Sequence, residues 1–152
     1  MGAVVGDIED VVHTYGDTLY RVAYMRVKNA ADAQDIVQET LMKYMDAAPK
    51  FVNAEHQKAW LIRVAINLSV NWIKSAWFRK TVSISGDVPY EHEEISDVFA
   101  RVMELSQKYR VLIHLFYYEG YSTAEIARIT RAKESTVRTG LTRARRILKE
   151  KL

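Results

Sequence analysis

The sequence lacks cysteine and is poor in proline and glycine, with two and six of them among 152 residues. Without cysteine, disulfides and thiolate metal sites are excluded. A membrane helix needs roughly 20 apolar residues in a row, but Arg63 and His114 interrupt the two longest apolar runs. The first ten residues include Asp7, Glu9 and Asp10 and no basic residue, which argues against a secretory signal. We therefore expect a protein of the cytoplasm with no membrane insertion.

The composition is that of a globular protein, since 49% of the residues are hydrophobic and 27% are charged. Wholesale disorder is excluded by this balance. The length allows one large domain or two small ones.

Charge is distributed unevenly along the chain, although the net charge is only +3. Residues 105–152 carry eleven basic and four acidic side chains, and residues 61–80 carry four basic side chains and no acidic one. Residues 81–104 carry six acidic side chains and one arginine. Such basic blocks are typical of a surface that binds a polyanion. The alternative is a set of solvated helix faces with no partner.

Apolar residues recur every three or four positions along most of the chain, which predicts an all-α fold. The expected helices cover about residues 8–27, 33–44, 53–78, 98–105, 109–118, 122–129 and 135–148. We expect Asp32, Asn53 and Ser135 to act as N-caps and Gly120 to follow a helix as its C′ residue.

The periodicity stops between residues 81 and 97, where Gly86, Pro89 and several glutamates occur. We interpret this segment as an acidic linker. The sequence therefore predicts two small helical domains, 1–80 and 98–152, joined by residues 81–97.

The C-terminal domain has the layout of a helix-turn-helix. Ser122 and Glu125 form a capping-box pattern at the start of a short helix, and about four residues separate this helix from the last one. If the stripe of Val137, Leu141 and Ala144 is buried, the last helix presents Thr139, Arg143 and Arg146 on another face. The neighbouring cations are Arg138 and Arg145, which flank this face, and Lys133 at the entrance of the helix. Such a helix can enter the major groove of DNA. A basic helix that only covers a bundle is the alternative.

One face of the second expected helix is acidic, because Asp32, Asp35 and Glu39 have the spacing i, i+3, i+7 and Gln38 lies beside them. Three carboxylates can serve a metal or acid–base site. However, no histidine shares this face, and the four histidines are scattered along the chain. An acidic face that meets a basic partner is the better account. We expect no catalytic residue, no metal and no cofactor.

Several segments resemble the extracytoplasmic-function (ECF) sigma factors of bacterial RNA polymerase. The similar segments are Asp32–Leu41, Ala59–Asn67, Glu119–Ala127, Ser135–Arg138 and Leu141–Arg145. They occur in the order of the family and span about residues 8–150. The resemblance implies a subunit that leaves phosphodiester chemistry to the core enzyme and contributes promoter recognition.

The resemblance also implies roles for individual residues of the N-terminal domain. The acidic helix would bind the coiled coil of the β′ clamp through Asp32, Asp35, Gln38 and Glu39. The minus-ten element would be opened by a loop that holds a flipped base and by a helix that follows the DNA backbone. The loop would consist of Lys50, Phe51, Val52 and Asn53, and the helix would contribute Arg63, Asn67, Lys74, Arg79 and Lys80. Aromatic side chains beside cations can stack on unpaired bases, although Phe51 can equally pack at the edge of its domain.

For the C-terminal domain, the resemblance implies contact with the minus-thirty-five element and with the polymerase β flap. It adds Ser135 and Thr136 to the DNA-contacting set. It further implies regulation by an anti-sigma factor.

The chain departs from the family pattern at four positions. Ser106 replaces a proline, Arg131 and Lys133 replace a glycine and a proline of the turn, and Gly140 replaces an arginine of the recognition helix. A non-glycine residue at positive φ is disfavoured, and glycine costs a helix about 1 kcal/mol relative to alanine. We therefore expect the geometry of the turn to be altered, and promoter binding by this domain to be either weaker or altered in specificity.

Three other functions remain compatible with these residues. A stand-alone helix-turn-helix regulator would bind DNA without polymerase. A sigma-like protein with weakened promoter reading would bind polymerase only. A carboxylate-dependent metal enzyme would use the acidic face of the second helix.

Overall fold

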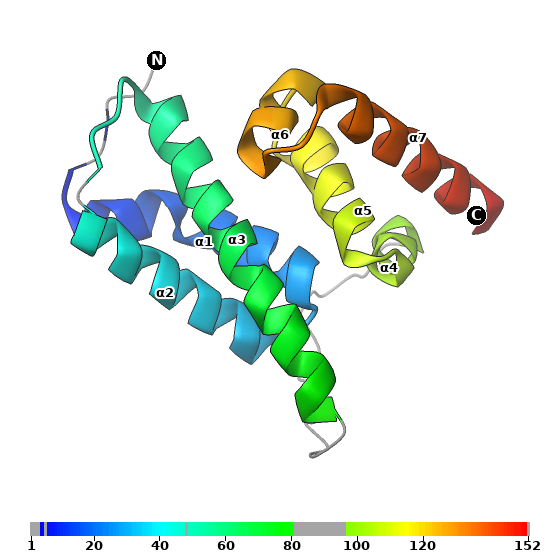
Figure 1. Ribbon diagram of the computed structural model, residues 1–152, viewed down its shortest axis with the longest axis horizontal. Coiled ribbons are helices and arrows are strands. Elements are labelled where there is room, and N and C mark those ends of the chain that lie inside the picture. Colours follow the sequence, from blue (N-terminus) through cyan, green and yellow to red (C-terminus); the bar gives the residue numbers. More distant parts are fainter. Residues whose placement is uncertain (1–3, 5, 48, 81–96, 152) are drawn as a thin grey trace. The chain divides into compact units, whose positions relative to one another are not determined.

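The computed structural model (Figure 1) describes residues 4, 6–47, 49–80 and 97–151, with the backbone only for 76–80 and 151. All the elements in these ranges are helical, in agreement with the predicted all-α class. They are α1 (Ile8–Val27), α2 (Ala30–Ala47), α3 (Ala54–Lys80), α4 (Asp97–Glu104), α5 (Gln107–Ile113), the π-helix η1 (His114–Tyr118), α6 (Thr123–Thr130) and α7 (Glu134–Lys151).

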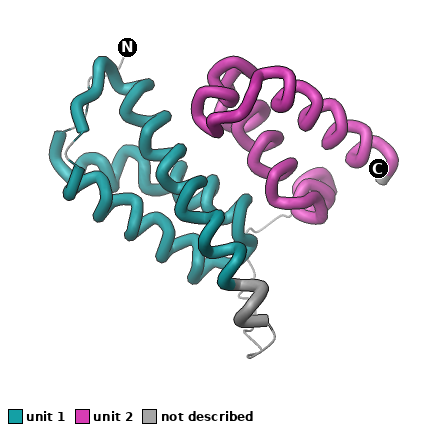
Figure 2. The backbone as a smooth tube through the Cα atoms, in the orientation of Figure 1, with its two compact units in different colours: residues 1–88 teal, residues 89–152 magenta. Residues whose placement is uncertain are grey.

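The chain divides into two compact units, Met1–Val88 and Pro89–Leu152 (Figure 2). Helices α1 to α3 belong to the first unit, and α4 to α7 belong to the second. Residues 81–96 of the expected linker lie outside the described residues, while Asp97 begins α4 instead of ending the linker. The domain limits at 80 and 98 stay predictions.

The N-terminal unit is a three-helix arrangement in which each helix contacts the other two. Its core includes six fully buried aliphatic side chains, namely Val11, Leu19, Val22, Ile36, Leu61 and Ile62. Two polar pairs lie within it: the Gln57 amide donates to the Tyr44 hydroxyl at 3.1 Å, and Arg26 Nε donates to Ser69 Oγ at 2.8 Å. Burial lowers the pKa of Arg26.

Two of the N-terminal helices begin at asparagine side chains. Asn53 Oδ1 accepts from the backbone N–H of His56 at 2.8 Å, so the expected cap of α3 is confirmed. The expected cap at Asp32 is wrong, because α2 already begins at Ala30 and Asn29 Oδ1 accepts from the N–H of Asp32 at 2.9 Å. Both residues suit an N-cap, and the one earlier in the chain has this role.

The C-terminal unit is built around α7, which contacts α4, α5 and α6. Its core includes Val111, Leu115, Ile126, Val137 and Leu141, each less than 4% exposed. The capping box is present in full, with Ser122 Oγ accepting from the Glu125 N–H and Glu125 accepting from the Ser122 N–H. Gly120 has a φ of 75°, as expected of a C′ residue.

The turn between α6 and α7 forms without glycine. Arg131 adopts the left-handed conformation with φ 57° and ψ 35°, and the Ala132 N–H donates to the Ala127 carbonyl at 3.0 Å. This hydrogen bond closes a Schellman-type end to α6. The left-handed conformation costs a non-glycine residue about 1–2 kcal/mol. The turn thus closes with a non-glycine residue at positive φ, and whether its geometry differs from that of the family stays a prediction.

Candidate nucleic-acid and protein interfaces

The acidic face of α2 is accessible at its centre. Asp35 and Gln38 are exposed, whereas Asp32 and Glu39 are half-buried. The face continues toward the C-terminal end of α2 with two exposed methionines, Met42 (52%) and Met45 (53%). Methionine is common on adaptable binding surfaces. The sequence pattern showed the carboxylates but gave no sign that these methionines are exposed.

The loop before α3 has a fixed aromatic part and an exposed tip. Phe51 is half-buried and stacks on Tyr44 with centroids 6.1 Å apart, and its edge contacts include Trp60 at 5.9 Å and His56 at 5.3 Å. Val52 is 87% exposed. Lys50 and Asn53 are also exposed. Of the four residues predicted to hold a base, Phe51 thus also packs within its unit, and its contact with a base stays a prediction.

A groove of about 600 Å³ lies beside this loop. It is lined by Val4, Gly6, Ile8, Tyr44, Met45, Pro49, Lys50 and Phe51. Its wall combines two aromatic rings and a methionine with one cation. This composition fits a planar, partly charged ligand such as a nucleotide.

The outer face of α3 carries part of the predicted backbone-contacting set. Asn67 and Lys74 are exposed, and Arg63 is half-buried. Their spacing of four and seven residues keeps these three on one side of the helix. Arg79 and Lys80 belong to α3, but their side chains lie outside those that the structure describes, as do those of Trp77 and Phe78.

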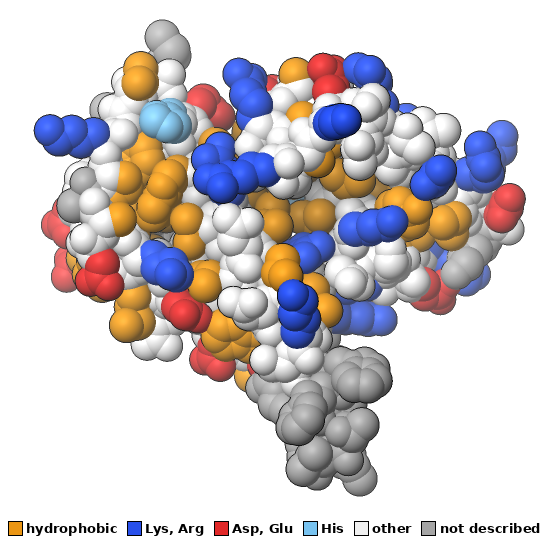
Figure 3. Space-filling view, viewed as in Figure 1, with side chains coloured by type: hydrophobic (Ala, Val, Ile, Leu, Met, Phe, Trp, Pro, Cys, Tyr) orange, Lys and Arg blue, Asp and Glu red, His pale blue; other side chains and the backbone are white. Residues whose placement is uncertain are grey.

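All seven residues predicted to contact the minus-thirty-five element are exposed on α7 or at its entrance. They are Lys133, Ser135, Thr136, Arg138, Thr139, Arg143 and Arg146. Lysine and arginine side chains accordingly lie along the surface that α7 forms (Figure 3). The expected cap at Ser135 is wrong, because α7 begins one residue earlier, at Glu134.

Glu134, at the start of α7, contacts one residue in the next turn of α7 and one residue of α6. Its Oε1 lies 3.0 Å from the Arg138 guanidinium and accepts a 2.9 Å hydrogen bond from the Thr123 hydroxyl. Arg138 is therefore oriented by an ion pair within the predicted DNA-binding face. Both partners are exposed, so the pair contributes little to stability.

Gly140 is buried and faces α5. A Cβ at this position would lie 2.6 Å from Leu112 Cδ1. The direction of this Cβ, toward α5, argues against the prediction that Gly140 removes a DNA contact. The effect of Gly140 on promoter binding stays a prediction.

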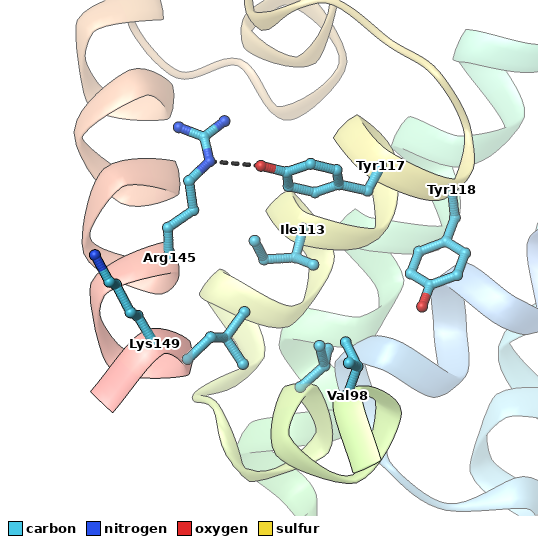
Figure 4. A pocket seen from close by; sticks show the side chains of 8 residues that line it. Val98, Ile113, Tyr117, Tyr118, Arg145 and Lys149 are labelled. Carbon is cyan, nitrogen blue, oxygen red and sulfur yellow. Dashed lines mark hydrogen bonds between the residues drawn. The ribbon is translucent and has the colours of Figure 1, made fainter. Parts of the chain in front are cut away.

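Arg145 belongs to a different surface from the predicted DNA-binding residues. Its Nε donates to the Tyr117 hydroxyl at 2.6 Å, and its guanidinium lies over the rings of Phe116 and Tyr117. The pair spans one side of an apolar groove of about 650 Å³ between α4, α5, η1 and α7 (Figure 4). Val98, Tyr117 and Tyr118 line this groove and are each at least half exposed. The sequence spacing had placed Arg145 at the flank of the DNA-facing residues.

No three histidine, aspartate or glutamate side chains of the described residues are grouped so that they could hold a metal ion. Within the same residues, no helix has the length and apolar character needed to cross a membrane.

Comparison with known proteins matches two family models to the two units. Residues 11–79 match Sigma-70 region 2, and residues 95–148 match Sigma-70, region 4. The ECF RNA polymerase sigma factor SigL of Mycobacterium tuberculosis is 33% identical over 143 residues, which cover 86% of this chain and 80% of SigL. The chain belongs to the ECF sigma factors of RNA polymerase.

Further relatives agree with this assignment. The sigma factor SigV of Bacillus subtilis is 29% identical over 141 residues, covering 88% of this chain and 83% of SigV. The fold is similar to that of the sigma factor RpoE of Bartonella quintana, solved in complex with the anti-sigma factor NepR. This similarity has a TM-score of 0.77, 23% identity and 96% coverage of both chains. As an ECF sigma factor, the protein directs core RNA polymerase to promoters.

Proposed function

We propose that the two units of this ECF sigma factor divide promoter recognition between them. The N-terminal unit binds core polymerase and opens the minus-ten element, and the C-terminal unit binds the minus-thirty-five element. The observation that carries the proposal is the exposed cationic and hydroxyl face of α7 directly after a helix-turn-helix turn. The family match to both regions supports it.

For polymerase binding, we assign the acidic face of α2 to the β′ clamp coiled coil. Asp35 and Gln38 are exposed at its centre, with Asp32 and Glu39 at its edges. Met42 and Met45 would extend the contact with apolar area, because they continue the same face. Carboxylates would orient the encounter with a basic partner, and buried methionine surface would add affinity.

For opening of the minus-ten element, we assign the groove beside Lys50 and Phe51 to an extruded base of the displaced strand. Flipping a base costs a few kcal/mol of stacking, and stacking on aromatic rings recovers about 1–3 kcal/mol per base. Asn67 and Lys74 on α3 would contact the neighbouring backbone, together with Arg63, Arg79 and Lys80. Binding energy alone would thus separate the strands.

For the minus-thirty-five element, we assign Ser135, Thr136 and Thr139 to base edges and sugars near the start of α7. The cations Lys133, Arg138, Arg143 and Arg146 would contact phosphates. A hydroxyl group can donate a hydrogen bond to a base edge or accept one from it. Arginines that contact phosphates fix the register of the helix on the duplex.

The protein would act as a binding subunit and not as an enzyme, because catalysis in this family belongs to the core polymerase. It would therefore act in the cytoplasm, where its polymerase operates. We also propose inhibition by an anti-sigma factor. This is suggested by the similar fold of RpoE, whose structure contains NepR.

The proposal is tested by transcription with purified core polymerase on templates randomised over the two promoter elements. With this protein present, transcripts should come from templates that share a minus-thirty-five and a minus-ten sequence. Core polymerase alone is the control. Transcripts that share neither element would contradict the proposal.

A further inference from the structure

The loop before α3 is closed by an unusual exchange of hydrogen bonds through His56. Asn53 is the N-cap of α3, so His56 occupies position N3, where its N–H donates to Asn53 Oδ1 at 2.8 Å. In a capping box, the N3 side chain is a glutamate or glutamine that accepts a backbone N–H in return. Here the N3 imidazole accepts instead from the residue before the N-cap, because its Nδ1 accepts from the N–H of Val52 at 3.3 Å.

The same imidazole also contacts the aromatic residue of the loop. Its ring meets Phe51 edge-on, with centroids 5.3 Å apart and an interplanar angle of 90°. Phe51 in turn stacks on Tyr44, which is buried. His56 therefore connects the exposed tip at Val52 to the aromatic cluster that is anchored in the core.

The bond to Val52 is not required by burial. The Val52 side chain is 87% exposed, and the hydrogen bond lies at the surface, where water could replace it. Its effect is thus conformational: it restricts the backbone of residues 51–53 beside the groove that contains Lys50 and Phe51. Ordering a loop before it binds reduces the entropy lost on binding.

We propose that His56 is a positioning residue for promoter opening, holding residues 51–53 in the conformation that receives the extruded base. This rests on the proposed role of the loop. His56 acts through the hydrogen bond of its Nδ1 to the backbone of Val52, and it needs no contact with DNA.

Three variants separate the hydrogen bond from the rest of the side chain. In His56→Asn, the amide oxygen can occupy the position of Nδ1 and accept from Val52. In His56→Ala, both the acceptor and the ring are lost. His13→Ala is the matched control, because His13 is another exposed histidine on a helix of the same unit.

Two measurements on the full chain are needed. Amide exchange of Val52 in the free protein should be faster in His56→Ala by about three- to tenfold, as for loss of one weak hydrogen bond. It should be close to the unchanged protein in His56→Asn and His13→Ala. With core polymerase and a promoter carrying a fluorescent base analogue in its minus-ten element, opening should slow by a similar factor in His56→Ala and recover in His56→Asn.

The outcomes distinguish the two proposals. If the unchanged protein with core polymerase opens no promoter, the proposed function fails and the role of His56 fails with it. If the unchanged protein opens the promoter and His56→Ala opens it equally fast, only the positioning role is overturned. Equal defects in His56→Asn and His56→Ala would also overturn it, because the acceptor at Nδ1 would then be irrelevant.

Discussion

At the scale of single residues, the position of Gly140 on α7 faces α5 in the interior of its unit. An arginine is usual at this position in the resembling family, which suggested a missing DNA contact. In this chain the position faces Leu112 of α5, whose Cδ1 lies 2.6 Å from where a Cβ would be, so the Leu112 side chain would have to shift. Glycine here allows close packing of α7 on α5, and this advantage offsets its poor helix propensity.

Replacing this glycine should therefore destabilise the C-terminal unit. We expect Gly140→Arg to lower the free energy of unfolding by about 1–3 kcal/mol, the usual cost of overpacking. Thr139→Arg is the control, because Thr139 is the exposed neighbour on the same helix. Chemical denaturation followed by circular dichroism measures both. Equal stability of the two variants would show that residue 140 does not pack against α5.

Periodicity could predict the buried stripe of α7 but not the partners of its exposed residues. Residue 140 lies three positions after Val137 and four before Ala144, both of which are buried. Its inward position could thus have been deduced from spacing alone. The bond of Arg145 to Tyr117 could not, because it joins residues 28 positions apart and depends on how η1 packs against α7.

At the scale of helices, α7 presents cations to two surfaces. Arg143 is exposed on the face assigned to DNA, whereas Arg145 bonds to Tyr117 beside the apolar groove. A cation that neutralises a phosphate releases a counterion, so it contributes to the salt dependence of binding. Arg143 and Arg145 should therefore differ in their contribution to the salt dependence of DNA binding.

Arg143→Ala should weaken binding to promoter duplex and reduce the slope of log affinity against log salt by about one. Arg145→Ala should leave the slope unchanged, although it removes the same charge from the same helix. Fluorescence anisotropy over a salt series measures both slopes. Equal slopes for the two variants would contradict the division of α7 into two faces.

The capping box of α6 makes the start of the helix-turn-helix sensitive to acid. The backbone hydrogen bond from Ser122 lowers the pKa of Glu125, helped by the Ser122 side chain. A carboxyl with a lowered pKa in the folded state stabilises that state above its unfolded pKa. This stability is lost as the pH falls through the folded value.

Glu125→Gln should remove this acid dependence, because glutamine can complete a capping box without titrating. At neutral pH the variant should be slightly less stable than the unchanged protein, and the difference should shrink as the pH falls below 4.5, the ordinary pKa of a glutamate carboxyl. Thermal unfolding at several pH values measures it. A difference that grows in acid would refute the assigned hydrogen bonds.

The elements themselves were largely predictable because helices are local. Capping residues and apolar spacing predicted the helix starts to within a few residues. The error at Asp32 arose because Asn29, three positions earlier, also suits an N-cap, and α7 starts before Ser135, at Glu134. The loop at residues 49–53 was less predictable. Its aromatic contacts join α2, the loop and α3, and such contacts depend on the packed fold.

At the scale of the whole molecule, each unit carries a different binding surface, and both surfaces serve promoter recognition. The first carries an acidic face on α2 and a groove beside the loop at residues 49–53. The second carries a cationic helix. A stand-alone DNA-binding regulator has no need of the acidic face. A measurement of binding to polymerase therefore distinguishes such a regulator from a sigma factor.

The central claim is tested most directly by competition with a housekeeping sigma factor for purified core RNA polymerase. The unchanged protein should compete, and Asp35→Lys should compete at least about tenfold less well, as expected when an interfacial charge is reversed. Asp17→Lys is the control, since Asp17 is an exposed acid on α1. Failure of the unchanged protein to compete, or undiminished competition by Asp35→Lys, would contradict the account.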